Sequence, residues 1–193
     1  MTARHDVSVW EGSLQEFRDR VAAAAPTPGG GAVAAVAATL AAALLRMVCA
    51  IALKRVADPE MSATVANIAR CEEKLAFFAE EDVRVFDGYM AARKLRDASA
   101  KSTIQDCLLA CAEVPLAAAE QVAKLEEYAA EIAGDSPKIL ASDLATARYL
   151  LNASRMALLS NVTANLVELE DGVAKRELLR RLEALPGDAN SAG

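Results

Sequence analysis

Aromatic side chains and histidine are scarce in this chain of 193 residues. Aromatic residues make up 4% of the sequence although hydrophobic residues make up 54%, and alanine is the most abundant of these. Runs that alternate β-branched and polar residues are nearly absent, so little is available to build a sheet. Alanine is the strongest helix former, and its small side chain lets helices approach closely. The composition therefore predicts an all-α fold.

The chain also lacks an excess of positive charge. It has 21 Lys and Arg against 27 Asp and Glu, for a net charge of −6 at pH 7. Because nonspecific nucleic-acid binding requires a basic surface, we expect no nucleic-acid partner.

No clear membrane segment or signal peptide is present. The stretch from Ala32 to Ile51 is apolar, but Arg46 interrupts it and alanine contributes little insertion energy. We expect this stretch to be a helix buried in a bundle or an oligomer core, with no membrane partner. Residues 1–10 are polar and contain no signal-peptide core, which predicts a cytoplasmic protein.

Residues with metal-ligand spacing are few. Cys107 and Cys111 are four apart, which could place two ligands on one helical face, but His5 is the only histidine and offers them no partner. Cysteine is commonly a small buried residue, so we expect reduced structural thiols and no metal site.

Prolines and glycines divide the chain into five or six predicted helices. Ser13 and Glu16 form a capping-box pattern that starts the first helix, which should end before Pro26. Pro115 should kink or divide a later helix, and Ser142 or Asp143 should cap the next one. The other expected boundaries are about 30–58, 60–95, 99–134, 142–171 and 175–185. We predict one domain over residues 1–185, a bundle of long and mostly antiparallel helices, and a disordered tail at 186–193.

A loop of prolines and glycines precedes the apolar stretch. Residues 26–31 read Pro-Thr-Pro-Gly-Gly-Gly, where proline stops the preceding element and glycine lets the main chain bend. A helix that starts here would offer free N–H groups and a positive dipole end to an anionic group. The loop is therefore either a ligand cradle or the start of a tightly packed helix.

With His5 in the N-terminal tail, any acid–base chemistry falls to carboxylates, lysines or polar groups held in a pocket, and two carboxylates stand out. Asp82 and Asp87 are five residues apart, so on a regular helix they point about 140° from each other and cannot form a dyad. Asp82 belongs to an acidic run, and we expect it to be solvated. Asp87 has Phe86, Tyr89 and Met90 around it, so we expect partial burial, or else a solvated or salt-bridged residue.

Asn161 and Asn165 are four residues apart within an apolar stretch, so they share one face of a helix. Asparagine is a poor helix former, and burial of its amide without partners is costly. The pair indicates either a buried polar network between helices or the lining of a pocket.

Taken together, these segments resemble the cyclodeaminase/cyclohydrolase family of folate enzymes. The matching pieces keep their order over about residues 14–170. They are Ala25–Gly31, Met47–Cys49, Asp82 with Phe86–Asp87, Val114–Leu116, Ser142–Asp143, and Asn161-Val162 with Asn165-Leu166.

The resemblance implies an all-helical homodimer that acts on tetrahydrofolate carrying a one-carbon unit at N5 or across N5 and N10. A cyclodeaminase closes the 5-formimino form to the 5,10-methenyl form and releases ammonia, whereas a cyclohydrolase hydrates the methenyl bridge to 10-formyltetrahydrofolate. Neither reaction needs a bound cofactor. The resemblance makes Asp87 the catalytic carboxylate that stabilises positive charge or shuttles protons. It assigns substrate binding to Gly29, Gly30, Gly31, Lys54, Ser142, Asp143, Asn161 and Asn165.

The chain also departs from the family pattern. Ala50 and Ala52 stand where family members carry polar residues, and Arg96-Asp97 replaces a proline-lysine pair. Alanine cannot hydrogen-bond a pterin through its side chain. The alternative interpretation is therefore a catalytically altered or noncatalytic homologue that binds another small molecule or a partner protein.

Overall fold

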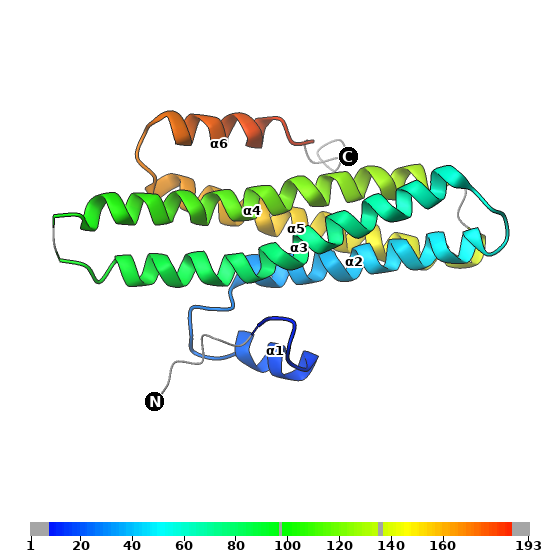
Figure 1. Ribbon diagram of the computed structural model, residues 1–193, viewed down its shortest axis with the longest axis horizontal. Coiled ribbons are helices and arrows are strands. Elements are labelled where there is room, and N and C mark those ends of the chain that lie inside the picture. The colour runs from blue at the N-terminus through cyan, green and yellow to red at the C-terminus, as the bar shows by residue number, and fades with distance from the viewer. Residues whose placement is uncertain (1–7, 97, 135–136, 187–193) are drawn as a thin grey trace.

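The computed structural model describes residues 8–96, 98–134 and 137–186, and within them it contains helices and no strand. This confirms the predicted all-α fold. Figure 1 shows the long helices lying side by side along one axis of the molecule. The elements are α1 (Leu14–Val21), α2 (Gly30–Leu53), α3 (Pro59–Ala92), α4 (Ala100–Glu131), the 3₁₀ helix η2 (Lys138–Leu140), α5 (Ala141–Glu168) and α6 (Val173–Glu183).

Four helices form the bundle. Helix α2 packs against α3 and α5, and α4 packs against the same two helices. The core between them consists of alanine and larger aliphatic residues, among which Leu45, Leu75 and Leu151 are fully buried. Helix α6 lies against α4, whereas α1 stands off from the bundle on the α2 side and contributes no buried residue (Figure 1).

Helix α2 is the most apolar element of the described chain. By length and composition it is the one helix there that could cross a membrane, with a mean hydropathy of 2.2 in its most apolar window. Only 44% of that window is buried inside the bundle. One side of α2 thus belongs to the core, as the sequence predicts, and much of the other side is exposed.

Several predicted helix ends are confirmed. The Ser13 side chain accepts a hydrogen bond from the Glu16 N–H, and the Glu16 carboxylate accepts one from the Ser13 N–H, which completes the capping box. Helix α3 begins with Pro59 after the cap Asp58, one residue from the expected start. Helix α4 contains Pro115 and continues past it as one helix, so the proline does not divide it.

The predicted cap of α5 is wrong. Neither Ser142 nor Asp143 caps the helix, because the 3₁₀ helix η2 runs directly into α5 and makes Leu140 the cap residue. The Leu140 N–H already donates to the Pro137 carbonyl at 2.8 Å, so the helix is nucleated one turn earlier than the sequence suggests. The tail predicted at 186–193 lies outside the described residues except for Pro186.

Candidate functional site

A cavity of about 280 Å³ opens where α2 begins. The loop before α2 forms one side of it, and α3, α4 and α5 contribute the rest. It is lined by Pro26, Thr27, Gly29, Gly30, Gly31, Asp82, Val85, Phe86, Cys111, Asn161, Ala164 and Asn165. The cavity therefore brings the glycine loop together with both asparagines, and the carboxylate that lines it is Asp82.

Asp82 is held against the first turn of α2. Its Oδ2 accepts a hydrogen bond from the Ala32 N–H at 2.8 Å, and this N–H is one of those that the helix leaves without an intrahelical acceptor. Burial raises the pKa of the carboxyl above its usual range, and the Ala32 hydrogen bond offsets part of that rise. The expectation of a solvated Asp82 is wrong, because Asp82 is half-buried and lies on the inward side of α3.

The close approach of the Asp82 carboxylate to the first turn of α2 explains why residue 31 is a glycine. A methyl group built on Gly31 would overlap the Asp82 Oδ1, so any side chain at this position displaces the carboxylate from the helix end. At Gly30 the same methyl group would lie 3.6 Å from the Asn161 Nδ2, an ordinary contact. No glycine in the described part of the chain has a positive φ. Gly31 is thus required for space and not, as the sequence suggests, for a bend of the main chain.

Asn165 joins two helices at the floor of the cavity. Its Nδ2 donates to the Cys111 carbonyl at 2.9 Å and to the Asn161 carbonyl at 2.9 Å. The Cys111 carbonyl would normally accept from the residue four positions later, which is Pro115 and has no N–H. Asn165 thus satisfies the carbonyl that the proline leaves free.

Asn161 is anchored in a similar way, since its Nδ2 donates to the Ala157 carbonyl at 2.8 Å. In both asparagines the donor groups bind backbone carbonyls, which leaves the Oδ1 atoms as acceptors for a ligand. The two interpretations of this pair therefore both hold. Asn165 forms a polar link between helices, and both residues line a pocket.

Asp87 lies outside the lining of the cavity. Its Oδ1 accepts a hydrogen bond from the Thr27 Oγ1 at 2.9 Å, so it ties the proline-glycine loop to α3. Thr27 is itself a lining residue. The structure thus places Asp87 where it can hold the loop in position, and it places Asp82 at the ligand-accessible surface.

Three predicted site residues lie at the opposite end of the bundle. Lys54 follows the last residue of α2, about 36 Å along the helix axis from Gly30. Ser142 and Asp143 are in the first turn of α5, whereas Asn161 and Asn165 are near its end. Within one chain, these three residues cannot share a small ligand with the glycine loop.

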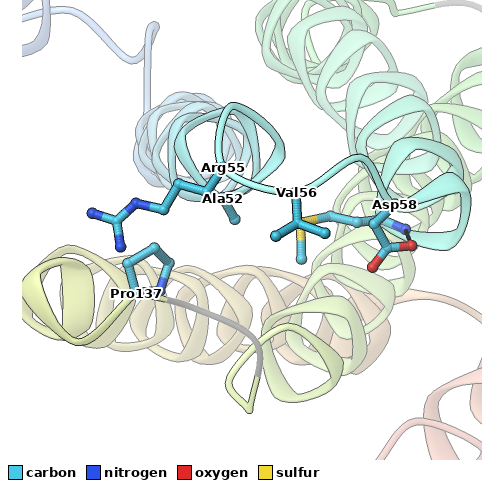
Figure 2. A pocket seen from close by; sticks show the side chains of 6 residues that line it. Ala52, Arg55, Val56, Asp58 and Pro137 are labelled. Carbon is cyan, nitrogen blue, oxygen red and sulfur yellow. Dashed lines mark hydrogen bonds between the residues drawn. The ribbon is translucent and has the colours of Figure 1, made fainter.

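A second hollow, of about 330 Å³, lies at that opposite end. Figure 2 shows Arg55 extending past Pro137, with Val56 and Asp58 on the other side of the opening. Asp58 is occupied as the cap of α3, where it accepts from the N–H groups of Glu60 and Met61. The hollow is larger than the cavity at Asp82, but Asp58, which already caps α3, is the only carboxylate among the described residues that line it.

Cys111 borders the cavity as a protonated thiol. Burial, together with the negative charge of Asp82, raises the pKa of Cys111 to about 12, so it is no nucleophile at neutral pH. The four cysteines are free, as expected for reduced structural thiols. Within the described ranges, no group of three or more His, Cys, Asp or Glu side chains is placed to hold a metal ion.

Sequence reasoning missed Asp82, but a signal for it exists. Leu75 and Ala79 precede it by seven and three residues, and Val85 and Tyr89 follow it by three and seven. All four are buried, so the helical repeat places Asp82 on the inward face of α3. Thr27, Phe86 and Cys111 carry no comparable signal, because their proximity depends on how the helices pack.

Comparison with known proteins gives consistent matches. A family model described as formiminotransferase-cyclodeaminase matches residues 13–184. A methenyltetrahydrofolate cyclohydrolase from Methylorubrum extorquens is 29% identical over 189 residues, which cover 93% of this chain and 91% of that protein. A formimidoyltransferase-cyclodeaminase from Sus scrofa is 30% identical over 92% of this chain, which spans only 35% of that longer protein.

A solved structure extends the likeness to the fold. The formiminotetrahydrofolate cyclodeaminase from Thermotoga maritima superposes with a TM-score of 0.84 at 33% sequence identity. The match covers 91% of this chain and 88% of that one.

The contact between Gly31 and Asp82 leads to a first prediction. We expect Gly31→Ala to destabilise the fold by about 1–3 kcal/mol, because the new methyl group and the carboxylate cannot occupy the same space. Gly30→Ala should cost less, since its methyl group makes an ordinary contact, and helix propensity there favours alanine. Urea denaturation of both variants measures the difference, and equal stabilities would contradict the assigned role of Gly31.

The raised pKa of Asp82 leads to a second prediction. The folded protein binds this proton more tightly than the unfolded chain, so the wild type loses stability as the pH rises from about 3.8 through the raised pKa. Asp82→Asn has no proton to lose there. At pH 7 we expect Asp82→Asn to melt at a higher temperature than the wild type. Each kcal/mol by which the free energy of unfolding increases should raise the melting temperature by about 2–4 °C, and the difference should close as the pH approaches 4.

Thermal melts of Asp82→Asn from pH 4 to pH 8 test this expectation. Asp106→Asn, at an exposed position on α4, is the control for loss of a negative charge. A gap between Asp82→Asn and the wild type that stays constant over this pH range would show that burial of the carboxylate carries no cost.

Proposed function

The chain belongs to the formiminotransferase-cyclodeaminase family, and from this membership we propose that it is a folate one-carbon enzyme acting on the N5/N10 unit of tetrahydrofolate. The reaction is the hydrolysis of the 5,10-methenyl bridge or the cyclisation of the 5-formimino group with release of ammonia. The observation that carries this proposal is the Asp82 carboxylate, held at the start of α2 inside a cavity that also contains two anchored carboxamides.

The negative charge of the Asp82 carboxylate is complementary to the positive charge that these reactions develop. Both pass through an amidinium-like carbon that bears positive charge, and a preorganised carboxylate stabilises such a centre. In the hydrolysis, water adds to the methenyl carbon and loses a proton to Asp82. As the bond from that carbon to N5 breaks, Asp82 gives the proton to N5, and the hydroxyl of the adduct loses its own proton to solvent to become the carbonyl of the 10-formyl product. In the cyclisation, N10 attacks the carbon of the protonated formimino group and loses its proton to Asp82, which returns that proton to the amino group as it departs as ammonia and leaves the methenyl cation.

The pKa of Asp82 supports its role as a proton carrier. Burial raises the pKa of the Asp82 carboxyl, so its carboxylate is a stronger proton acceptor than an exposed aspartate. The hydrogen bond from Ala32 fixes the carboxylate before substrate arrives, so little reorganisation is needed during the reaction. We therefore assign to Asp82 the catalytic role that the family resemblance gave to Asp87.

The other lining residues recognise the substrate. The Oδ1 atoms of Asn161 and Asn165 are acceptors for the N–H groups along the edge of the pterin ring. Phe86 offers an aromatic surface for the ring, and the N–H groups at Gly30 and Gly31 face a carbonyl or anionic part of the folate. Asp87 acts indirectly as a positioning residue, because it holds Thr27 and with it the loop.

We further propose that the enzyme is a cytoplasmic homodimer of bundles with mostly antiparallel helices, and that it needs no bound cofactor. The folate substrate is the small-molecule partner. Ala50 and Ala52, which raised the alternative of an altered homologue, lie near the far end of α2 and do not line the cavity at Asp82. Asp97 lies outside the described residues.

The direct test uses the two candidate substrates. We expect purified protein to lower the absorbance of 5,10-methenyltetrahydrofolate if it is a cyclohydrolase, or to generate that absorbance from 5-formiminotetrahydrofolate if it is a cyclodeaminase. A folded protein that changes neither signal above background would favour the noncatalytic alternative.

The two aspartates give a sharper prediction. Asp82→Asn should lower kcat by about 10²–10⁴-fold, because the amide cannot take or return the proton. Asp87→Asn keeps an oxygen that accepts from the Thr27 hydroxyl, so kcat should change less than tenfold and any loss should appear in KM. Steady-state kinetics on both variants separate these outcomes, and a larger loss of kcat in Asp87→Asn would reverse the assignment.

A further inference from the structure

Pro115 is a proline in the interior of a long helix. Helix α4 runs without a break from Ala100 to Glu131, and the side chain of Pro115 is fully buried within the bundle. Proline is the least favourable residue in a helix interior, because it lacks an N–H and its ring crowds the carbonyl four residues earlier. An aliphatic residue would fill the same buried space and keep the helical hydrogen bond, so the proline points to another role.

The carbonyl that Pro115 leaves without a main-chain donor lies beside the cavity at Asp82. It belongs to Cys111, which is a lining residue of that cavity. Pro115 itself is four residues, or about 6 Å, further along α4 and is not among the described residues that line the cavity. Pro115 therefore acts on the site through the Cys111 carbonyl and not by contact with a ligand.

The side-chain amide of Asn165 is held by two helices. Its Nδ2 carries two hydrogens, and it donates to the Cys111 carbonyl on α4 and to the Asn161 carbonyl on α5, each at 2.9 Å. Because the carboxamide is planar, two donors bound to two helices fix both its plane and the direction of Oδ1. With the bond to α5 alone, the group could turn about its last torsion, which has no sharp minimum of its own. The bond to Cys111 thus determines where Oδ1 points.

Asn161 offers a comparison within the same cavity. Its Nδ2 donates to the Ala157 carbonyl at 2.8 Å, so this hydrogen bond stays within α5. Both asparagines line the cavity. A change at position 115 therefore acts on the carboxamide of Asn165 and leaves the anchor of Asn161 in place.

We propose that Pro115 is a positioning residue for the folate site. It keeps the Cys111 carbonyl free of a main-chain donor, and that carbonyl then orients the Asn165 carboxamide so that Oδ1 points into the cavity. The Oδ1 accepts a hydrogen bond from an N–H at the edge of the pterin, and this identity of the ligand rests on the proposed function. Because the acceptor is oriented before substrate arrives, the substrate pays less to order it on binding.

The possible roles of this buried proline lead to different outcomes. If Pro115 served packing alone, its replacement would change the stability of the fold and leave the binding of substrate unchanged. An effect on Asp82, whose hydrogen bond comes from the first turn of α2, would appear in kcat. Loss of the orientation of Asn165 weakens an interaction made with substrate and transition state alike, so it appears in KM.

The first experiment measures the steady-state kinetics of Pro115→Ala. We expect KM to rise by about three- to tenfold, the range for one weakened hydrogen bond, with kcat within about twofold of the wild type. Leu116→Ala is the matched control, because Leu116 is fully buried at the next position of α4 and its truncation removes more volume. Leu116→Ala should melt at a lower temperature and keep the wild-type KM. An unchanged KM in Pro115→Ala, or a loss confined to kcat, overturns the inference.

The second experiment combines Pro115→Ala with Asn165→Ala in a double-mutant cycle. Asn165→Ala should raise KM in the wild-type background, and Pro115→Ala should then raise it no further. Asn165→Ala should also lower the melting temperature more in the wild type than in Pro115→Ala. In the wild type it leaves the Cys111 carbonyl unpaired, whereas in Pro115→Ala the new main-chain N–H pairs that carbonyl. Additive effects on both quantities contradict the coupling.

A third experiment separates the missing N–H of proline from its ring. Lactic acid, incorporated at position 115 during translation, has the side chain of alanine and an ester oxygen in place of the N–H. It therefore lacks the donor, as proline does, and also lacks the ring. We expect this ester variant to keep the wild-type KM. A KM as high as that of Pro115→Ala would assign the effect to the ring and overturn the inference.

A measurement without substrate separates failure of this inference from failure of the proposed function. In nitrogen-edited NMR spectra, the side-chain N–H protons of Asn165 should exchange with solvent more slowly in the wild type than in Pro115→Ala. Those of Asn161 should exchange alike in both proteins. If this difference is seen but the wild type converts neither folate, the orientation by Pro115 stands and the proposed function fails. Equal exchange at Asn165 in both proteins overturns the inference, whatever the activity.

Discussion

The contact between the Asp82 carboxylate and the first turn of α2 determines how the candidate site is built. It joins the first turn of α2 to α3, it requires glycine at position 31, and it orients an acidic group within the cavity. A carboxylate in this place costs folding free energy because burial disfavours its charge. Such a cost is typical of groups that are retained for chemistry, since an amide would fit the same space without it.

The remaining polar groups of the cavity are held by backbone carbonyls and by the loop. Asn165 and Asn161 use their donor groups on carbonyls of α4 and α5, and Asp87 fixes the loop through Thr27. The ligand-facing atoms are therefore positioned by helices that belong to the core. This arrangement provides the fixed dipoles on which electrostatic catalysis depends.

Much of the fold, and part of the site, could be predicted from the sequence. Helix content, the capping box at Ser13 and most helix limits follow from local propensity and from proline and glycine. The family resemblance grouped the glycine loop with Asn161 as substrate-binding residues, and both line the cavity at Asp82. The preference for Asp87 over Asp82 came from the family resemblance and from the residue types beside Asp87, and it overlooked the helical repeat that turns Asp82 inward. The family resemblance grouped Lys54 with the loop, although the helix predicted at about 30–58 already implied that the length of that helix separates them.

The proline in α4 has a consequence for homologous chains. Pro115 removes one main-chain donor, and the side chain of Asn165, fifty residues later, supplies its replacement. The proline and the asparagine depend on each other, because a main-chain N–H at position 115 would compete with the Asn165 side-chain amide for the Cys111 carbonyl. Over evolutionary time the two positions should therefore change together, so that a lineage that loses the proline is released from its need for the asparagine. Covariation between positions 115 and 165 would therefore indicate the contact between α4 and α5.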